Sequence, residues 1–310
     1  MPFLGVDKLF KRRTEKSKAQ EAQPKTDKQD DIRASPIRAS WPRRFKILLM
    51  LKTTARFYTR LDCCVPISKD LIVKINRNVD STEAATMEFL AANAPGVPVP
   101  RVYCAFVRRG RAYIAMERIQ GASILAEYIK LESEDDRARL LAHLKSIMQE
   151  LRSLLPPSPN RVESCIGGSL YDWRIAHSKS ARFGPFGSVR RFHQWLRQDI
   201  REEELGDNLD SREKEKIVKM IARQDAEVWP APVFTHGDLN PSNILAKDGQ
   251  ITGIIDWEFS GWYPSYWEYT STYIRNYMRA WWQSLLPQFL DPYPEDLTME
   301  ATRDIWWGEI

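Results

Sequence analysis

One segment of this 310-residue chain is more informative than any other, and it reads Val233-Phe234-Thr235-His236-Gly237-Asp238-Leu239-Asn240-Pro241-Ser242-Asn243-Ile244-Leu245. A second apolar run, Ile251–Ile255, ends at Asp256, twelve residues after Ile244. That run predicts a short buried strand with Asp256 at its end. Phosphoryl transfer from a nucleotide needs an Asp that orients and deprotonates the acceptor hydroxyl, and an Asn and a second Asp that hold magnesium on the phosphates. The spacing therefore predicts Asp238 as the catalytic residue and Asn243 and Asp256 as metal ligands.

The residues around this segment resemble the aminoglycoside phosphotransferase and choline kinase-like family, and within it they are most similar to the fungal branch. That branch carries F-T-H-G-D-L-x-P-x-N-I-L, followed by G-I-I-D-W-E-x-x-G-W-Y-P-x-Y-W-E-Y. The chain carries both runs almost unbroken from Phe234 through Tyr269, and a weaker resemblance extends upstream to Leu71. The resemblance implies an α+β, two-lobed protein-kinase-like fold, with a small antiparallel β lobe and a larger, mainly helical lobe. It also implies ATP and Mg²⁺ as cofactors.

The charge of the chain is unevenly distributed. Residues 1–46 hold 13 Lys and Arg against 6 Asp and Glu, whereas the remainder holds 33 against 35. The leader has few large apolar residues, and such a composition cannot bury enough surface to order itself. We expect a disordered basic leader at residues 1–40, a nucleotide-binding lobe at 41–119 and a catalytic and substrate lobe at 120–310. We see no basic residues interleaved with aromatic ones on a folded face, and so we expect no nucleic-acid partner.

Composition also bears on the membrane and on the redox compartment. A spanning helix needs about 18 or more consecutive apolar residues, and the best candidate, Phe45–Leu51, is too short and too basic. No transmembrane segment is expected. The four cysteines show no C-x-x-C spacing, which favours reduced, structural thiols in a cytoplasmic protein.

A lone lysine marks the nucleotide side of the molecule. Lys74 interrupts the apolar run Leu71–Ile75, and a buried lysine is costly unless an anionic group meets its ammonium. In the kinase arrangement those anions are the nucleotide phosphates and a Glu on the following helix. Glu83 and Glu88 compete for this pairing, and the family pattern favours Glu83.

The next strand is expected to lead into the hinge between the lobes. Residues 112–117 read as the last strand of the small lobe. The resemblance implies that Met116 flanks the adenine and that the backbones of Glu117 and Ile119 hydrogen-bond it. An ordinary edge strand would show the same pattern.

The loop that covers the phosphates in protein kinases has no counterpart here. The chain has no glycine between Gly5 and Gly96, and residues 58–70 leave room for one hairpin. The phosphate-covering region is therefore shortened or displaced. This leaves two readings open, a working phosphotransferase and a nucleotide-binding pseudokinase or scaffold.

The acceptor is expected to be a small molecule. Gly237 stands where protein kinases have the Arg that receives an activation-loop phosphate, and only a short segment follows Asp256. Both features argue against a protein kinase, a third alternative. His236 is expected to hydrogen-bond the backbone around Asp256, and Glu268 to anchor a buried Arg.

Two further features concern the acceptor's charge. The aromatic residues between Trp257 and Trp282 could form a cage for a quaternary amine, but their helical spacing favours packing. Apolar residues at helical spacing likewise predict a core helix at residues 134–155. The acidic carboxyl-terminal end, with Glu295, Asp296 and Glu300, either lines the site of a cationic acceptor or forms a solvated helix.

Overall fold

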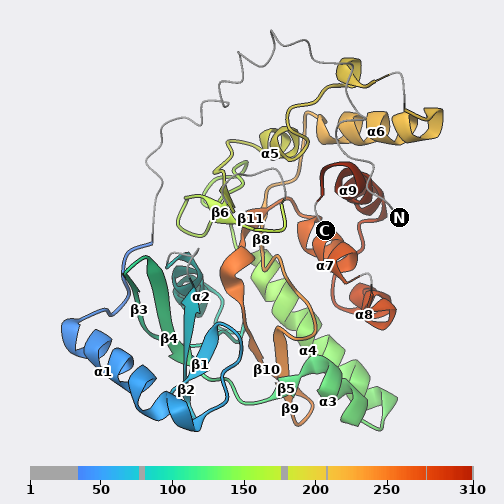
Figure 1. Ribbon diagram of the computed structural model, residues 1–310. Helices are drawn as coiled ribbons and strands as arrows, with labels where there is room; N and C mark the ends of the chain where they lie inside the picture. Colours follow the sequence, from blue (N-terminus) through green and yellow to red (C-terminus); the bar gives the residue numbers. More distant parts are fainter. Residues whose placement is uncertain (1–33, 77–80, 176–180, 207–208, 277, 309–310) are drawn as a thin grey trace.

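The computed structural model describes residues 34–76, 81–175, 181–206, 209–276 and 278–308. The expected leader lies outside these ranges as far as residue 33, so the prediction of its disorder stays a prediction. Two lobes are visible, a small one built on a sheet and a larger one that is mainly helical (Figure 1). The two-lobed α+β expectation is therefore confirmed.

The small lobe is built on one antiparallel sheet. Its strands occur in the order β1-β2-β4-β3. Arg109 and Gly110 connect β3 to β4, and both have positive φ angles, 51° and 69°, as a two-residue hairpin turn with the twist of the sheet requires. The strands are β1 (Cys64–Pro66), β2 (Leu71–Asn76), β3 (Val102–Arg108) and β4 (Arg111–Glu117).

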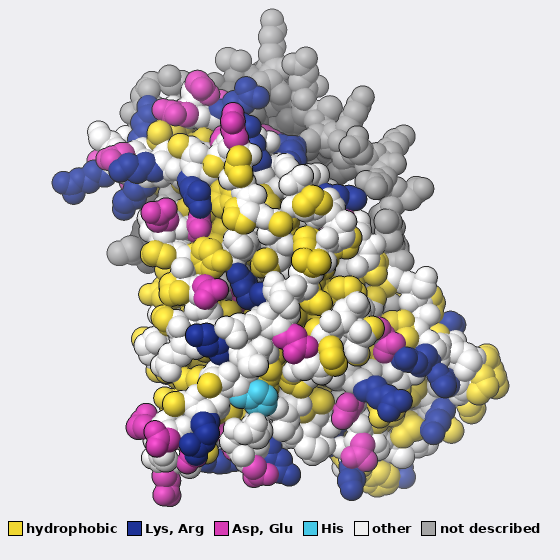
Figure 2. Space-filling model, turned by 180° about the vertical axis from the view of Figure 1, so that it is seen from behind, with side chains coloured by type: hydrophobic (Ala, Val, Ile, Leu, Met, Phe, Trp, Pro, Cys, Tyr) yellow, Lys and Arg dark blue, Asp and Glu magenta, His cyan; other side chains and the backbone are white. Residues whose placement is uncertain are grey.

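The two faces of this sheet are covered by different helices. Side chains alternate between faces along a strand, so Val73 and Lys74 of β2 point to opposite sides. Val73 packs beneath α1 (Trp41–Lys52), in a cluster with the buried Ile47. Lys74 faces α2 (Thr82–Asn93) on the other side. From behind, hydrophobic and basic side chains gather together over the α1 region, at the lower right of Figure 2.

The large lobe is organised around the long helix α4 (Glu134–Ser153), which Ser133 caps through its side chain. Short antiparallel sheets pack beside it, β5 with β9 and β10, and β8 with β11. Its strands are β5 (Ala122–Ser123), β6 (Leu170–Tyr171), β7 (Arg182–Phe183), β8 (Val233–Thr235), β9 (Ile244–Lys247), β10 (Gln250–Ile254) and β11 (Gly261–Tyr263). Its other helices are α3 (Ile124–Lys130), α5 (Val189–Leu196), α6 (Ser211–Gln224), α7 (Trp267–Arg275), α8 (Ala280–Leu285) and α9 (Pro294–Trp307). Single 3₁₀ turns lie at Thr54–Phe57, Glu202–Glu204, Trp257–Phe259 and Leu286–Gln288.

The elements predicted from periodicity are present. The apolar runs at residues 71–75, 112–117 and 251–255 form β2, β4 and β10, and the predicted core helix is α4. The aromatic residues pack as expected, with Trp257, Trp262, Tyr266 and Trp282 each 0% exposed. They are therefore core residues and do not form a cage.

One hydrophobic cluster joins the lobes, because it contains residues of α2, β4, α4, β10 and α8. A second lies among α5, α6 and α9. No helix in the described part of the chain is both long enough and apolar enough to cross a bilayer.

Candidate active site

The loop between β8 and β9 is held in place by a buried carboxylate. Glu268, at the start of α7, is 0% exposed and accepts the backbone N–H groups of His236 at 2.6 Å and Gly237 at 3.1 Å. The prediction that Glu268 anchors an arginine is wrong. Buried backbone N–H groups need hydrogen-bond acceptors, and the Glu268 carboxylate accepts from two such groups of this loop, not from an arginine. Burial raises the pKa of Glu268, and the hydrogen bonds from the backbone N–H groups of His236 and Gly237 act against this rise.

Gly237 occupies a place that no other residue can take without strain. Its φ is 83°, and a Cβ there would lie 2.7 Å from the carbonyl oxygen of Phe259. The glycine in the motif therefore allows the backbone to pass close to the 3₁₀ turn after Asp256. This is a physical reason for the missing protein-kinase arginine at this position.

His236 links the two halves of the site, as predicted. Its Nε2 lies 3.0 Å from the carbonyl oxygen of Ile255, and its Nδ1 accepts the N–H of Asp238 at 3.1 Å. Because a carbonyl can only accept, the ring proton resides on Nε2. The N–H of Ile255 in turn donates to the carbonyl of Asn243 at 2.9 Å. The loop that carries Asp238 and the segment that carries Asp256 are thus fastened to one another.

Three donors meet the carboxylate of Asp238. Asn243 and Asn240 donate their amides to Oδ2 at 2.9 and 3.0 Å, and Arg174 donates to Oδ1 at 2.7 Å. Arg174 also pairs with Asp172 at 2.8 Å and lies 4.0 Å from the Phe259 ring centroid. Neither Arg174 nor Asn240 was predicted from the sequence. Asn240 lies inside the motif and could have been suspected, whereas Arg174 is 64 positions away in an irregular segment.

Lys74 gathers three carboxylates at the interface of the lobes. Its Nζ lies 2.6 Å from Asp256, 2.9 Å from Glu83 and 3.2 Å from Glu258. Glu83 is thus the glutamate that meets the lysine, while Glu88 pairs with Arg38. Glu258 was not predicted, although it lies only two positions beyond Asp256.

Burial and charge oppose one another in this cluster. Burial alone would lower the pKa of Lys74, but Glu83, Asp256 and Glu258 together hold it above its usual value. Burial raises the pKa of Glu83 to about 7, against the attraction of Lys74. One ammonium group thus faces three carboxylates, so the cluster keeps an excess of negative charge.

That excess suits a divalent cation. Oxygen atoms of Glu83, Asp256 and Glu258 lie within 4.8 Å of one another, and Asn243, 8% exposed, lies on the adjoining loop. Carboxylate and amide oxygens are the ligands that Mg²⁺ prefers. The donor set therefore fits the predicted metal, with Glu258 as an additional candidate ligand.

Met116 and Glu117 are the last two residues of β4 and Ile119 follows the strand, but one of their backbone groups already has a hydrogen-bond partner. Met116 is buried and faces Ile72 in the β2–β4 register. The N–H of Glu117 donates to the carbonyl of Arg101 at 2.9 Å, so only its carbonyl is left for an adenine. Ile119 lies against Gly253, where a Cβ would come within 2.8 Å of the Ile119 side chain. The adenine-binding role of these residues stays a prediction.

A tight turn stands where protein kinases have the glycine-rich loop. Leu61 and Cys64 form an antiparallel bridge with hydrogen bonds of 2.9 and 2.8 Å. The turn and the three-residue strand β1 are compatible with a phosphate-covering region that is shortened or displaced, which stays a prediction. The hydrogen bond from Cys64 lowers the pKa of the Cys63 thiol to about 7 against the effect of burial, and Lys74 adds to the lowering. Cys63 therefore lies within the electrostatic reach of Lys74.

The acidic end of the chain does not form a free acceptor surface. Asp296 pairs with Arg223 at 2.9 Å, and Glu300 is 2% exposed and pairs with Arg303 at 2.7 Å. The reading in which these carboxylates line an acceptor site is wrong for both residues, because arginines of the large lobe already neutralise them. Glu295 alone of the three remains on the surface.

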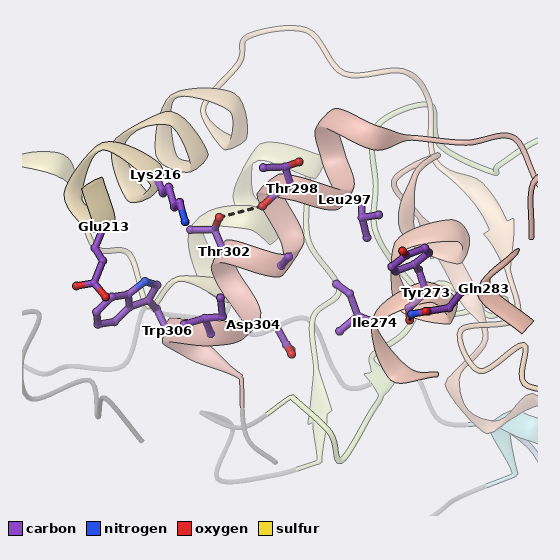
Figure 3. A pocket seen from close by; sticks show the side chains of 12 residues that line it. Glu213, Lys216, Tyr273, Ile274, Gln283, Leu297, Thr298, Thr302, Asp304 and Trp306 are labelled. Carbon is purple, nitrogen blue, oxygen red and sulfur yellow. Dashed lines mark hydrogen bonds between the residues drawn. The ribbon is translucent and has the colours of Figure 1, made fainter. Parts of the chain in front are cut away.

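A cavity of about 640 Å³ opens in the large lobe among α6, α7, α8 and α9 (Figure 3). Most of its walls are apolar, and Glu213, Lys216 and Asp304 add charge. A smaller charged pocket beside it contains Asp172 and Arg174, and it shares Ile274 and Asp304 with the cavity. Arg174 connects that pocket to Asp238. The cavity is lined by Glu213, Lys216, Tyr273, Ile274, Gln283, Leu297, Thr298, Ala301, Thr302, Asp304, Ile305 and Trp306.

A protein-family model described as a phosphotransferase enzyme family matches residues 69–303. The chain belongs to this phosphotransferase family. The match includes Lys74, Asp238, Asn243 and Asp256, so the segments that meet in the site all lie inside the family region. No curated protein matches the chain.

Solved structures of phosphotransferases are similar to the chain at low identity. A thermostable mutant of aminoglycoside phosphotransferase APH(4)-Ia is 15% identical, with 78% of this chain and 80% of that chain covered and a TM-score of 0.49. The streptomycin–ATP complex of APH(2")-IIa is also 15% identical, with 83% and 85% covered and a TM-score of 0.47. Macrolide 2'-phosphotransferase MphH from Brachybacterium faecium is 18% identical, with 75% and 74% covered and a TM-score of 0.41.

Proposed function

We propose that this protein transfers the terminal phosphoryl group of ATP, in a Mg²⁺-dependent reaction, to a hydroxyl of a small molecule. The observation that carries the proposal is that two pairs of side chains meet, and that the segments carrying Asp256 and Asp238 are hydrogen-bonded to one another. Lys74 lies 2.6 Å from Asp256 across 182 positions of sequence, and Asp238 lies 2.9 Å from Asn243. Phosphoryl transfer needs this set of residues, because its catalysis is mainly positioning and charge stabilisation.

Each of these residues has a role that follows from its contacts. Lys74, fixed by Glu83, would turn its ammonium group from Asp256 and Glu258 to the phosphates. Asp256 and Asn243 would hold Mg²⁺, with Glu258 in reach, and the ion would neutralise charge on the phosphates. Asp238 would accept the proton of the acceptor hydroxyl, since its loop is fastened by His236 and Glu268 for an in-line approach.

The short segment after Asp256 supports a small acceptor. Only five positions separate Asp256 from Gly261, the first residue of β11, which leaves no long loop on which a peptide could dock. The run from Phe234 through Tyr269 also supports placement in the fungal branch of the family.

The cavity beside the site supports a partly apolar acceptor. Arg174, which pairs with Asp238, lines the small charged pocket, and that pocket borders the larger cavity, where Tyr273 and Trp306 lie in the wall (Figure 3). We place the body of the acceptor there. A cationic acceptor would have to use Asp304 or Glu213, because Asp296 and Glu300 have arginine partners.

A second function, nucleotide binding without turnover, is favoured by one observation. Arg174 holds Asp238 in an ion pair at 2.7 Å, in the place where an acceptor hydroxyl would approach. An acceptor that displaces Arg174 would free the Asp238 carboxylate to act as the base. If the Arg174–Asp238 ion pair is permanent, the protein would be a pseudokinase. The tight turn at Leu61–Cys64 is compatible with either function.

The test combines binding with turnover. Purified protein is incubated with radiolabelled ATP, Mg²⁺ and fractionated metabolite extracts, with the Asp238→Asn variant as control. Labelled product that forms with the native chain and not with the variant supports the phosphotransferase. Stabilisation by ATP and Mg²⁺ in a melting experiment, without product from any fraction, would favour the second function, and no response to ATP would exclude both.

A further inference from the structure

The outer side of α1 exposes large apolar side chains. Trp41 is 75% exposed, Phe45 53% and Leu49 47%. Residues four positions apart lie on the same face of a helix, so these three form one stripe. Trp41 and Phe45 stack on one another with ring centroids 5.4 Å apart. An apolar stripe that faces water needs an explanation, since contiguous exposed apolar surface marks an interaction site.

The stripe is fixed in place by the other side of the same helix. Ile47, 5% exposed, packs into the cluster with Phe106 on the outer face of the sheet. A groove of about 500 Å³ runs between α1 and β3, and Val107, 53% exposed, adds an apolar side chain to its wall. The stripe therefore belongs to a rigid surface of the folded small lobe.

The rim of this surface is basic. Residues 34–61 contain no Asp or Glu. Arg38 is left out of the rim, because Glu88 already pairs with it. The expectation that the chain has no basic–aromatic surface is therefore wrong here. Arg44, Lys52 and Arg108 line the groove. Further basic residues on the same or adjoining segments are Arg43, Lys46, Arg56, Arg60, Arg109 and Arg111.

We propose that this α1 surface docks the protein on an anionic lipid bilayer. Helices that lie in a membrane interface present Trp, Phe and Leu on one side and Lys or Arg around them. The basic residues would meet the lipid phosphates and carboxylates, while Trp41, Phe45 and Leu49 enter the interface. No activity of the protein is needed for this docking, so it stands apart from the proposed phosphotransferase function.

The positive charge of the rim favours an anionic bilayer over the other partners that could cover this surface. A second copy docked through the same surface would bring two basic rims together. Residues 1–33 hold 9 Lys and Arg against 6 Asp and Glu, so they are not complementary to the rim either. A nucleic acid has the right charge, and Trp41 and Phe45 could stack on its bases. Leu49 and Val107, however, are aliphatic and gain nothing from such stacking. A bilayer interface takes up the aliphatic and the aromatic side chains alike.

Vesicle sedimentation of the full chain tests the proposal, with phosphatidylcholine vesicles compared with vesicles that also contain phosphatidylserine. One variant removes the stripe (Trp41→Ala, Phe45→Ala and Leu49→Ala), and a second removes charge (Arg43→Ser, Lys46→Ser and Lys52→Ser). Matched controls change equally exposed residues elsewhere. These are Ile129→Ala, Leu155→Ala and Val228→Ala for the stripe, and Arg139→Ser, Arg212→Ser and Lys219→Ser for the charge.

We expect the native chain to bind the phosphatidylserine vesicles and each α1 variant to bind at least about tenfold more weakly, since each basic residue near such a surface contributes several-fold. The controls should bind like the native chain, and all variants should keep its melting temperature. Brominated lipid should quench part of the tryptophan fluorescence, and Trp41→Ala should remove that part. Native-like vesicle binding by both α1 variants, no vesicle binding by the native chain, or binding to nucleic acid that vesicles cannot compete would each overturn the proposal.

Discussion

At the scale of single residues, each charged side chain of the site is oriented by the oppositely charged or hydrogen-bonding groups around it. Asp238 has two amides and a guanidinium on its oxygens, and these contacts fix its orientation before any substrate arrives. In the proposed reaction, the arginine is the partner that an acceptor displaces. A change at Asp238 should therefore affect proton transfer, while the nucleotide contacts proposed for Lys74 and Asp256 stay in place.

We predict that Asp238→Asn lowers kcat by about 10²–10⁴-fold, the range typical of a lost general base. The affinity for ATP should change little. Steady-state kinetics and calorimetric ATP binding would measure the two effects separately. Asp248→Asn, at an exposed turn position with a φ of 52°, is the matched control and should leave both unchanged. Equal turnover in Asp238→Asn and the native chain would remove Asp238 from the mechanism.

Cys63 gives a pH-dependent prediction at the same scale. Its thiol pKa is about 7, because Cys64 hydrogen-bonds to it and Lys74 lies in reach, whereas the pKa of Cys64 is raised by the same contact and by burial. The thiolate is the reactive form, so alkylation of Cys63 should accelerate as pH rises through 7. Rates with iodoacetamide, followed by mass spectrometry from pH 5.5 to 9, would show the midpoint, and ATP should slow the reaction. Cys63→Ser should abolish the fast phase, and a midpoint near 9 would contradict the prediction.

At the scale of elements, a prediction from the sequence succeeded where the pattern behind it lay within one short segment. Alternation and helical spacing are properties of a few neighbouring residues, and they located β2, β4, β10 and α4. The segments around Lys74 and Asp238 could also be recognised from the sequence, because few combinations of residue types and spacings suit phosphoryl transfer. Arg174 could not be predicted, since only tertiary packing brings it to Asp238.

Other errors at this scale share one cause. Glu268 was assigned an arginine partner, yet the nearest donors are backbone N–H groups, which no residue pattern reveals. Asp296 and Glu300 looked like part of a solvent-facing acidic run, but tertiary packing buries both. Arg223 of α6 and Arg303, three positions after Glu300 on α9, pair with them. A charge run in sequence therefore did not predict a charged surface.

The junction of α5, α6 and α7 provides a prediction on stability. His193 of α5 is 0% exposed, with Nδ1 3.2 Å from the Gln224 carbonyl and Nε2 2.6 Å from the Tyr266 hydroxyl. Burial lowers its pKa from 6.5 to about 3, so the fold favours the neutral ring. The resulting stability is present above the unfolded pKa of 6.5 and is lost as pH falls from there toward 3. Between pH 7.5 and 5.5 the loss should be about 1.4 kcal/mol.

Thermal unfolding across that interval would measure this loss. His193→Gln keeps a polar group of similar length but does not titrate, so its melting temperature should fall less steeply with decreasing pH than that of the native chain. The difference in slope is the readout, because buried carboxylates away from this junction, such as Glu83, titrate alike in both proteins. Parallel pH profiles for the two proteins would show that His193 does not charge on unfolding.

At the scale of the whole molecule, the two lobes meet through the Lys74 cluster and through one continuous hydrophobic core. Lys74 and Glu83 belong to the small lobe, while Asp256 and Glu258 belong to the large lobe. Like-charged carboxylates this close repel one another, and Lys74 offsets only part of that repulsion. A divalent cation would complete the neutralisation and so would draw both lobes toward the nucleotide.

The last prediction follows from this arrangement. Asp256→Ala should abolish the Mg²⁺-dependent part of nucleotide binding, because the variant loses a metal ligand and one of the charges that attracts the ion. Calorimetric titration with a non-hydrolysable ATP analogue, with Mg²⁺ and with a chelator, would compare the two conditions directly. The native chain should bind more tightly with Mg²⁺, and Asp256→Ala should bind alike in both. Asp291→Ala, an exposed acidic residue of the same lobe, is the control for net charge and should keep the native difference. If Asp256→Ala kept the full Mg²⁺ dependence, the ion would have to be held by Asn243 and Glu258, and the metal role would pass from Asp256 to them.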